Sequence, residues 1–515
     1  MAQGALPFKY EEKEKSGLTA LAGLPTFFEL AFVLGMVGSI ERHLTVRANS
    51  QGWMDAEHVM GLILLNLAGG DHVDDLDRLE ADDGLCEVML RLRSHGLSRK
   101  ERRKLKHRWR KGRQRAFASR SATHRYLKEF HNPAEEERRK EESEKGKRAF
   151  IPAPTRHLQG LQRVCTDLVA TVHKHHPVKT ATLDQDATLN MCNKAEALHC
   201  YKGPKAYQPF NTWWAELQLM LHTEFRDGNV PAGHEQLRCF KEALDCLPEG
   251  VSQVFLRSDT AGYQHKLMHY CAEGKNERFG VVQFTISCNV SPEFKAAVRR
   301  VNELQWHRLY RTDEEGDKLA TNQEWAEVFF VPTDDRRGKD VTPYRYLAIR
   351  EVVSNPELPG TEQSNPELPF QTVRLGPKDR QYKLTGVVTN RTLGGERLIW
   401  WHRERCGKSE EVHDILKNEL AGGVLPSGYF GSSAAWWWIT ILSFNLLMAM
   451  KRLALPDEWL PRRLKAIRFH IIGVPGMVVR HARQLTIKLG GGRGSYELLV
   501  GIRAAIAGLL PAPAT

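Results

Sequence analysis

The stretch KTATLDQD, Lys179–Asp186, decides the fold, because apolar and polar residues alternate along it as they do along a strand. A second strand candidate, VSQVFLRSD at Val251–Asp259, also ends in an aspartate. Strand candidates Ala206–Glu216 and Gln218–Phe225 lie between these two, and Phe279–Val290 follows them. Helical periodicity separates the later strands, so the predicted order is three strands, helix, strand, helix, strand, which is typical of an α/β domain.

Three acids stand out by their positions in this pattern. If the first and fourth strands are neighbours, Asp186 and Asp259 lie at matching strand ends and face one crevice. Glu410, early in a later helix candidate, can supply a third carboxylate. Carboxylates are the ligands that Mg²⁺ takes in proteins, and three of them could hold two ions across a phosphate. A single aspartate after a strand is more often a turn or helix cap, so the prediction depends on the three together.

The rest of the chain divides by pattern. Short β-rich runs follow the helix candidate Pro292–Tyr310, and helical signals return at Gly394–Leu420. The predicted domains are a helical N-terminal DNA-binding domain (1–155), the first part of the α/β core (156–290), a β-rich insertion (291–392), the second part of the core (393–472) and a basic C-terminal tail with a helix (473–515).

Charge and composition favour a nucleic-acid partner inside the cell. The 515 residues include 74 Lys and Arg against 62 Asp and Glu, a net charge of +12 that suits a polyanion. The nine cysteines contain no Cys-x-x-Cys pair, so we expect free thiols in a reducing cytoplasm and no zinc ribbon. The N-terminus has no basic segment followed by an apolar one, so no signal peptide is predicted.

One stretch concentrates the positive charge. Arg91–Lys128 contains sixteen Lys or Arg and a single acid, Glu101. A merely solvated helix usually mixes the two signs, so we expect this stretch to contact the DNA backbone. The residues expected to do so are Arg102, Arg103, Lys104, Lys106, Arg108 and Arg110.

The segment Ala434–Met450 has seventeen residues without a charge. A membrane-spanning helix needs about 20 apolar residues. Because Thr440, Ser443 and Asn445 also interrupt its apolar character, we predict a buried core helix and no membrane association.

These features resemble a known family. The quoted strands and helices are similar to the DDE transposases of bacterial insertion sequences, in the branch with a Tyr-Arg-Glu-Lys signature. The resemblance implies a ribonuclease-H-like catalytic core interrupted by a β-rich insertion, with a mostly helical N-terminal domain. The stretches that carry it are LDQDAT (Leu183–Thr188), FLRSDTAGY (Phe255–Tyr263), RCGKSEEVHDILKNELAGG (Arg405–Gly423), GWMDAEHVMGLILLNLAGGDHVDDL (Gly52–Leu76) and SRSATHRYLKEF (Ser119–Phe130).

The resemblance also assigns the acids. The family's Asp-x-Thr motif matches Asp186 rather than Asp184, which we expect to support it from the same side of the strand. Glu410 and Lys417 have the signature's spacing, seven positions apart on one helix face. Glu410 is preferred for this reason, and Glu411, which does not share that face with Lys417, is the alternative.

The signature arginine departs from the family spacing. Arg405 is one residue too far from Glu410, which leaves Arg403 and Arg405 as alternatives. Together with Lys417 they are expected to hold DNA phosphates. Related enzymes commonly stack a flipped base on an aromatic residue of the insertion; Trp306 and Trp325 are candidates, with core packing as the alternative.

The implied activity is metal-dependent cleavage at transposon ends followed by transfer of a 3′-hydroxyl into target DNA. The implied cofactor is a pair of Mg²⁺ ions, for which Mn²⁺ can substitute. The implied partners are double-stranded terminal inverted repeats and target DNA, bound by a dimer on paired ends in the bacterial cytoplasm at the nucleoid. The alternatives are a metal-dependent DNA nuclease on the same core and a catalytically inactive, DNA-binding remnant.

Overall fold

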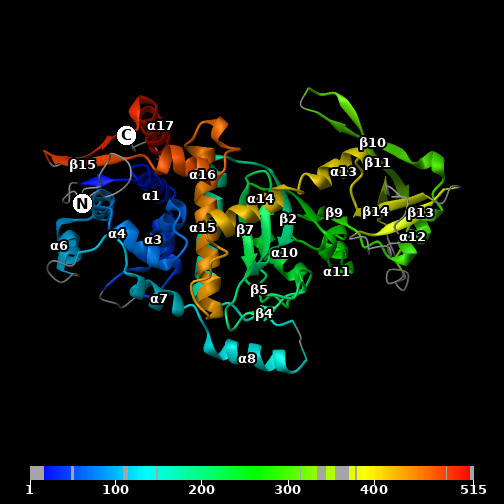
Figure 1. Ribbon diagram of the computed structural model, residues 1–515, viewed down its shortest axis with the longest axis horizontal. Coiled ribbons are helices and arrows are strands. Elements are labelled where there is room, and N and C mark those ends of the chain that lie inside the picture. Colours follow the sequence, from blue (N-terminus) through cyan, green and yellow to red (C-terminus); the bar gives the residue numbers. More distant parts are fainter. Residues whose placement is uncertain are drawn as a thin grey trace, which may run out of the picture.

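The computed structural model describes residues 17–47, 52–107, 114–146, 149–313, 315–332, 344–353, 370–376, 380–482 and 484–510. Three regions follow one another along its longest axis (Figure 1): helices at one end, a helix-covered sheet in the middle, and a second group of strands at the other end. Both chain ends lie at the helical end, so the first and last described segments are neighbours in space.

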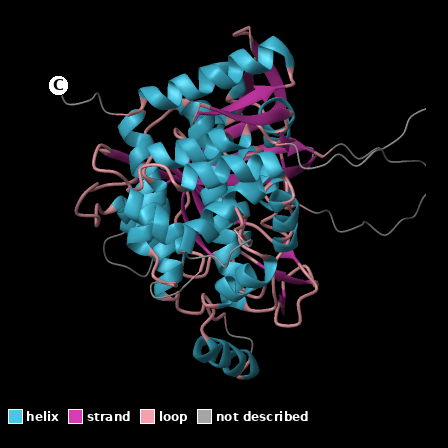
Figure 2. Cartoon of the chain, turned by 90° about the vertical axis from the view of Figure 1, so that its left-hand side faces the viewer, coloured by secondary structure: helices cyan, strands magenta, loops and turns pink. Residues whose placement is uncertain are grey.

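The N-terminal region is mostly helical, as predicted, and Figure 2 shows helices covering this end of the molecule. Its longest apolar helix, α3, ends at Gly69, whose φ of +97° is a conformation that favours glycine. The helices are α1 (Leu24–Val33), α2 (Met36–His43), α3 (Asp55–Ala68), α4 (Leu76–Glu80), α5 (Asp83–Arg93), α6 (Arg99–His107), α7 (Arg120–Lys128) and α8 (Pro133–Glu144).

The central sheet has the ribonuclease-H-like strand order β9-β8-β2-β6-β7. Parallel pairs join β2 to β8 and β8 to β9, whereas β2–β6 and β6–β7 are antiparallel. The predicted fold class is therefore confirmed. These strands are β2 (Thr180–Ala187), β6 (Phe210–Trp214), β7 (Leu219–Glu224), β8 (Gln253–Ser258) and β9 (Gln283–Ser287).

The strand predicted over Ala206–Glu216 is divided in two. Its first part, β5 (Lys205–Tyr207), pairs with β3 (Asn190–Met191) and β4 (Leu198–His199) in a separate small sheet. Pro209 stands between β5 and β6, and proline cannot donate the hydrogen bond that a continuous strand would need there.

The insertion continues the core sheet instead of forming a sheet of its own. Val388 of β14 pairs antiparallel with Ile286 of β9, which gives ten strands in one sheet. The helix predicted over Pro292–Tyr310 was too long: α12 (Pro292–Arg299) ends early, because the residues from His307 pair with β11. The insertion strands are β10 (His307–Thr312), β11 (Lys318–Val328), β12 (Arg345–Val352), β13 (Thr372–Leu375) and β14 (Arg380–Thr389).

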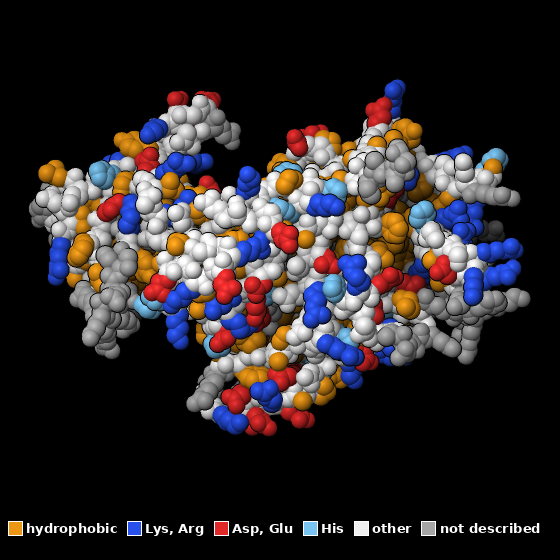
Figure 3. Space-filling model, turned by 180° about the vertical axis from the view of Figure 1, so that it is seen from behind, with side chains coloured by type: hydrophobic (Ala, Val, Ile, Leu, Met, Phe, Trp, Pro, Cys, Tyr) orange, Lys and Arg blue, Asp and Glu red, His pale blue; other side chains and the backbone are white. Residues whose placement is uncertain are grey.

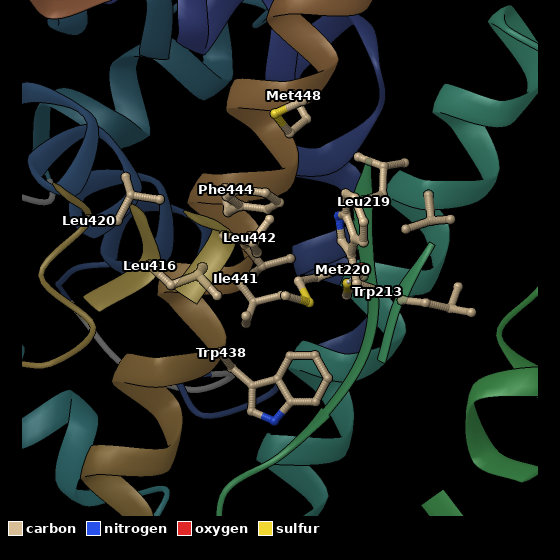
Figure 4. Close-up of a cluster of buried hydrophobic side chains, with 14 of the residues drawn as sticks. Trp213, Leu219, Met220, Leu416, Leu420, Trp438, Ile441, Leu442, Phe444 and Met448 are labelled. Atoms are coloured by element: carbon tan, nitrogen blue, oxygen red, sulfur yellow. Dashed lines mark hydrogen bonds between the residues drawn. The ribbon is translucent and has the colours of Figure 1, made fainter. Parts of the chain in front are cut away.

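One apolar helix, α15 (Phe430–Leu453), runs through the core. Figure 4 shows its Trp438, Ile441 and Phe444 among side chains from β7 and from the segment that carries Leu416 and Leu420. Among the described helices, α15 is the single one that is long and apolar enough by itself to cross a membrane, yet its apolar window is 100% buried by the rest of the protein. The other helices against the sheet are α9 (Arg156–His175), α10 (Gln236–Asp245) and α11 (His265–Ala272).

The C-terminal segment packs back on the N-terminal helices. Met477 of β15 (Gly476–His481) pairs with Leu18 of β1 (Leu18–Thr19), and β16 (Gln484–Leu489) completes the three-stranded sheet. The last helix, α17 (Gly492–Gly508), lies against α1, and its Arg503 binds Glu29 at 2.8 Å. Arg468, after α16 (Leu464–Ile467), donates to the carbonyls of Leu67 at 2.8 Å and Asn66 at 2.7 Å, at the end of α3.

Candidate active site

Asp186 and Asp259 lie at the same edge of the sheet, because β2 and β8 are parallel neighbours. Asp186 is near the end of β2, and Asp259 follows β8 directly. Gln185 and Ser258 are level in the strand register, so each aspartate is the next residue after a paired position. This placement brings the two carboxylates to matching ends of adjacent strands.

The pKa of Asp186 indicates which charges surround it. Burial is the main reason that this pKa is raised from 3.8 to about 6, and Arg405 acts in the opposite direction. The negative charges of Asp259 and Glu410 raise it further. The charges of the other two acids singled out in the sequence, Asp259 and Glu410, thus both act on Asp186.

Glu410 reaches this cluster because the helix that carries it starts anew. The helical signals over Gly394–Leu420 correspond to three elements: α13 (Gly395–Arg403), α14 (Lys408–Asp414) and a π-helical turn (Ile415–Glu419). The break falls at Gly407, whose φ of +77° is disfavoured for residues with a Cβ. Glu410 Oε2 accepts the Gly407 N–H at 2.6 Å and caps α14.

Glu411 faces other residues. Its carboxylate lies 4.0 Å from Lys408, and its charge acts on Lys451, a buried residue of α15. Of the two neighbouring glutamates, Glu410 is the one whose charge acts on Asp186.

The donor set of the cluster fits divalent cations. One oxygen of Asp186 accepts the Ala187 N–H at 2.9 Å, and one of Asp259 accepts the Ala261 N–H at 3.0 Å, which orients both groups. In the part of the chain that the structure describes, the cluster forms one ion pair, between Arg405 and Asp186 at 3.7 Å. Three carboxylates facing one arginine leave an excess of negative charge that bound divalent cations would balance.

Two other groups of described residues bring potential ligand atoms within 4.8 Å of one another. In the first, Glu224 forms ion pairs of 2.7 and 2.5 Å with two arginines, which already balance its charge. The second is a turn between β10 and β11, in which the carboxylate of Asp313 accepts backbone N–H groups. The groups are Glu224–Cys239–Glu242 and Asp313–Glu315–Asp317. The three predicted acids are not grouped in this way, but two ions held side by side do not require all ligands to meet at one point.

The predicted phosphate-binding residues take different places. Arg405 is 8% exposed and lies at the carboxylates, where its guanidinium also approaches the Gln185 carbonyl at 3.5 Å. Arg403 donates to Gln323 of β11 at 2.8 Å, and burial lowers its pKa. Lys417 lies in the π-helical turn, where burial also lowers its pKa. Arg405 is thus the signature arginine nearest to the candidate catalytic acids.

Asp184 forms an ion pair that the sequence analysis missed. Arg257 of β8 stands opposite Asp184 in the strand register and holds both carboxylate oxygens, at 2.6 and 2.9 Å. The same guanidinium donates to the Trp401 carbonyl at 2.7 Å and to Glu404 at 2.8 Å, which ties α13 to the sheet. The signal was present in the sequence, because a charged residue inside each of two buried strands calls for an opposite partner.

The basic N-terminal residues are only partly described. Arg102 and Arg103 are exposed on α6, and Figure 3 shows Lys and Arg side chains on the surface of this end of the molecule. Lys104 and Lys106 belong to α6, while Arg108 and Arg110 lie outside the described residues.

The two tryptophans of the insertion are engaged in packing. The Arg350 guanidinium lies 4.1 Å from the centre of the Trp306 ring. The Trp325 ring fills the space beside Gly395, where an added Cβ would approach it to 2.1 Å. Both contacts favour the core-packing alternative over base stacking.

Comparison with known proteins shows a match to one protein family. A family model described as transposase DDE domain group 1 matches residues 15–331, which include Asp186 and Asp259 and end before Glu410. No curated protein matches the chain. The cryo-EM structure of a piggyBac transposase synaptic complex with hairpin DNA is similar over 97% of this chain and 89% of that chain, with 9% identity and a TM-score of 0.41.

Proposed function

The chain belongs to the transposase DDE domain family, group 1, and we propose that it catalyses cut-and-paste DNA transposition. It would cleave at the ends of its element and transfer the 3′-hydroxyl into target DNA. The observation that carries the proposal is that Asp186 and Asp259 lie at matching ends of two parallel strands, and that the charges of Asp259 and of Glu410 on α14 both act on Asp186.

Different residues of the chain would bind the cations and the DNA phosphates. Asp186, Asp259 and Glu410 would hold two Mg²⁺ ions, or Mn²⁺ in their place. When bound, such ions activate the attacking oxygen and stabilise the leaving oxygen of a phosphate. Arg405 offsets part of the carboxylate charge and would also hold a phosphate oxygen, and Arg403 and Lys417 would hold other phosphates.

We propose double-stranded DNA as the partner, both as terminal inverted repeats and as target. A dimer would pair the two ends, in the bacterial cytoplasm at the nucleoid. The exposed arginines of α6 and the net charge of +12 support contact with the phosphate backbone. We expect no membrane association, in keeping with the burial of α15.

The decisive experiment changes Asp259→Asn and separates the two chemical steps. The substitution keeps the side-chain size but removes a charge that would hold a cation. End cleavage and the joining of pre-cut ends should both be lost, because both steps need the same carboxylates. The assay uses a labelled terminal repeat, intact or with a free 3′-hydroxyl, together with a plasmid target and Mg²⁺.

Each alternative has its own signature in this assay. A wild type that cleaves but never joins pre-cut ends would favour the nuclease. A wild type that binds ends but does neither, even with Mn²⁺, would favour the inactive remnant. Joining by Asp259→Asn at the wild-type rate would contradict a shared metal site.

A second experiment tests the DNA contact of α6. Neutralising Arg102, Arg103, Lys104 and Lys106 together should weaken end binding and flatten its dependence on salt. Each lost phosphate contact lowers the log–log slope by about 0.9, so four contacts would lower it by roughly 3.6. The measurement is the dissociation constant at several salt concentrations, and an unchanged slope would exclude this helix from the interface.

A further inference from the structure

A row of polar side chains crosses the sheet beside the candidate site. Asp186 of β2 is level with Asn211 of β6, and Asn211 is level with Thr223 of β7. Residues opposite each other in antiparallel pairs project to the same face of a sheet. Asn211 and Thr223 are only 1% and 2% exposed. Buried polar groups at this position therefore need specific partners.

Those partners form a continuous chain of hydrogen bonds between two helices. Trp437 of α15 donates its indole N–H to Thr223 Oγ1 at 2.8 Å, and Thr223 donates to Asn211 Oδ1 at 2.6 Å. Asn211 Nδ2 then donates to His413 Nε2 of α14 at 3.1 Å. An indole can only donate, which is consistent with this direction and leaves His413 as a neutral acceptor. Burial lowers the pKa of His413 to about 3, which agrees with that state.

His413 connects this chain to the candidate catalytic glutamate. It lies three residues after Glu410 on α14, and residues three apart share one side of a helix. The helix has only seven residues and is bounded by Gly407 and the π-helical turn, so its rotation depends on side-chain contacts, among them the ion pair between Asp414 and Arg463. The bond from Asn211 is one of them, and it starts from the residue level with Asp186.

We propose that Asn211 and His413 are positioning residues that fix α14 so that Glu410 faces Asp186 across the cation site. This inference rests on the proposed function. Neither side chain needs to touch a cation or DNA. Asn211 of the sheet donates the hydrogen bond that holds α14, and His413 of α14 accepts it. Loss of the bond would let α14 rotate or move outward, which separates Glu410 from the two aspartates. Removing a residue that orients a metal ligand typically weakens metal binding by about 10- to 100-fold.

The test compares three variants with a matched control. His413→Ala and Asn211→Leu remove the bond, whereas His413→Gln keeps an acceptor near the position of Nε2. The control is Asn445→Leu, because Asn445 is equally buried and also bridges a helix to this sheet, through Met220 N and O at 2.8 Å. It anchors α15 instead of α14. The readouts are Mn²⁺ affinity of the full chain by calorimetry, thermal unfolding, and end cleavage as a function of Mn²⁺ concentration.

We expect His413→Ala and Asn211→Leu to weaken Mn²⁺ binding about 10-fold or more, with cleavage partly restored at high Mn²⁺. His413→Gln should bind within about threefold of the wild type. Asn445→Leu should lower the unfolding temperature without changing Mn²⁺ affinity. Wild-type Mn²⁺ affinity in His413→Ala would overturn the inference, as would an equal loss in Asn445→Leu. If Asp259→Asn also leaves Mn²⁺ binding and cleavage unchanged, the proposed function fails as well; if Asp259→Asn abolishes both, only the positioning role fails.

Discussion

Two carboxylates stand two residues apart on β2, and their surroundings are opposite. Asp184 is 2% exposed and is held through both oxygens by Arg257. The side chain of Asp186 is 24% exposed, and with the described residues it forms one ion pair, at 3.7 Å to Arg405. Its other charged neighbours, Asp259 and Glu410, are negative.

The difference separates a carboxylate that holds the fold together from one that is available for binding. A buried carboxylate is tolerable when it is ion-paired and hydrogen-bonded, as Asp184 is to Arg257; burial still raises the pKa of Asp184. Negative neighbours without matching cations cost folding free energy, and a divalent cation would remove that cost. Asp184 thus has a positive partner for its carboxylate, whereas Asp186 is left with unbalanced negative charge around it.

Removing the Asp184 carboxylate should have the largest effect on stability. Asp184→Asn leaves the Arg257 guanidinium buried with part of its bonding lost, which should lower the free energy of unfolding by about 3–5 kcal/mol. Urea unfolding at pH 7 measures this loss. The double variant Asp184→Leu with Arg257→Met should recover part of it, because an apolar pair can replace a buried ion pair at little cost. A loss below about 1 kcal/mol in the single variant would remove the contrast between the two positions.

Removing the Asp186 carboxylate should change stability in the opposite direction and raise the free energy of unfolding. The folded-state pKa of Asp186, about 6, lies above its unfolded value of 3.8. The folded protein therefore binds more protons between these values, and stability falls as pH rises through this window. In metal-free buffer at pH 7, Asp186→Asn should be more stable than the wild type by about 2 kcal/mol, allowing for partial exposure.

That gain should fall to a small remainder near pH 4, where the folded carboxyl is protonated and the unfolded one is only partly ionised. The measurement is urea unfolding of both proteins with a chelator at pH 4 and pH 7. Added Mn²⁺ should stabilise the wild type more than the variant. A variant that is less stable than the wild type at pH 7 would contradict the excess of negative charge at this position.

The smallest expected effect concerns Arg405, which forms an ion pair with Asp186. Because Arg405 lowers the pKa of Asp186, Arg405→Gln should move the pH window of the stability loss upward, by about one unit or less. Stability measured from pH 4 to pH 8 without metal gives the shift. No shift would mean that Arg405 does not neutralise Asp186, and would return it to the role of a phosphate ligand alone.

The sequence was sufficient for the parts of the fold that depend on local pattern. Alternation along Lys179–Asp186 and Val251–Asp259 placed two strands and their terminal aspartates, and the order of elements led to the confirmed fold class. Local pattern could not reveal that β14 pairs with β9, because the partners Val388 and Ile286 are far apart in the chain. Helical periodicity also ran past Arg299, where pairing with β11 takes over.

The candidate catalytic acids could be predicted from the sequence, but the residues that hold them in place could not. The positions of Asp186, Asp259 and Glu410 could be proposed from strand ends and motif spacing, and they remain predictions until variants are tested. Gly407 was a visible glycine, but nothing in the spacing indicated that its positive φ would divide a helix. Asn211 and His413 carry no sequence signal, because their bond joins a strand to a helix across 202 positions of the chain.

The pairing of β1 with β15 has a consequence for synthesis on the ribosome. In β1, Leu18 pairs with Met477 of β15 and Thr19 pairs with Gly476. The neighbouring helix α1 packs against α17. A nascent chain grows at roughly 5–20 residues per second, so the first helices wait roughly 20–90 s for these partners. The helical end of the molecule therefore completes its packing only after β15 and α17 have been synthesised, and so after the sheet with the candidate catalytic residues has emerged.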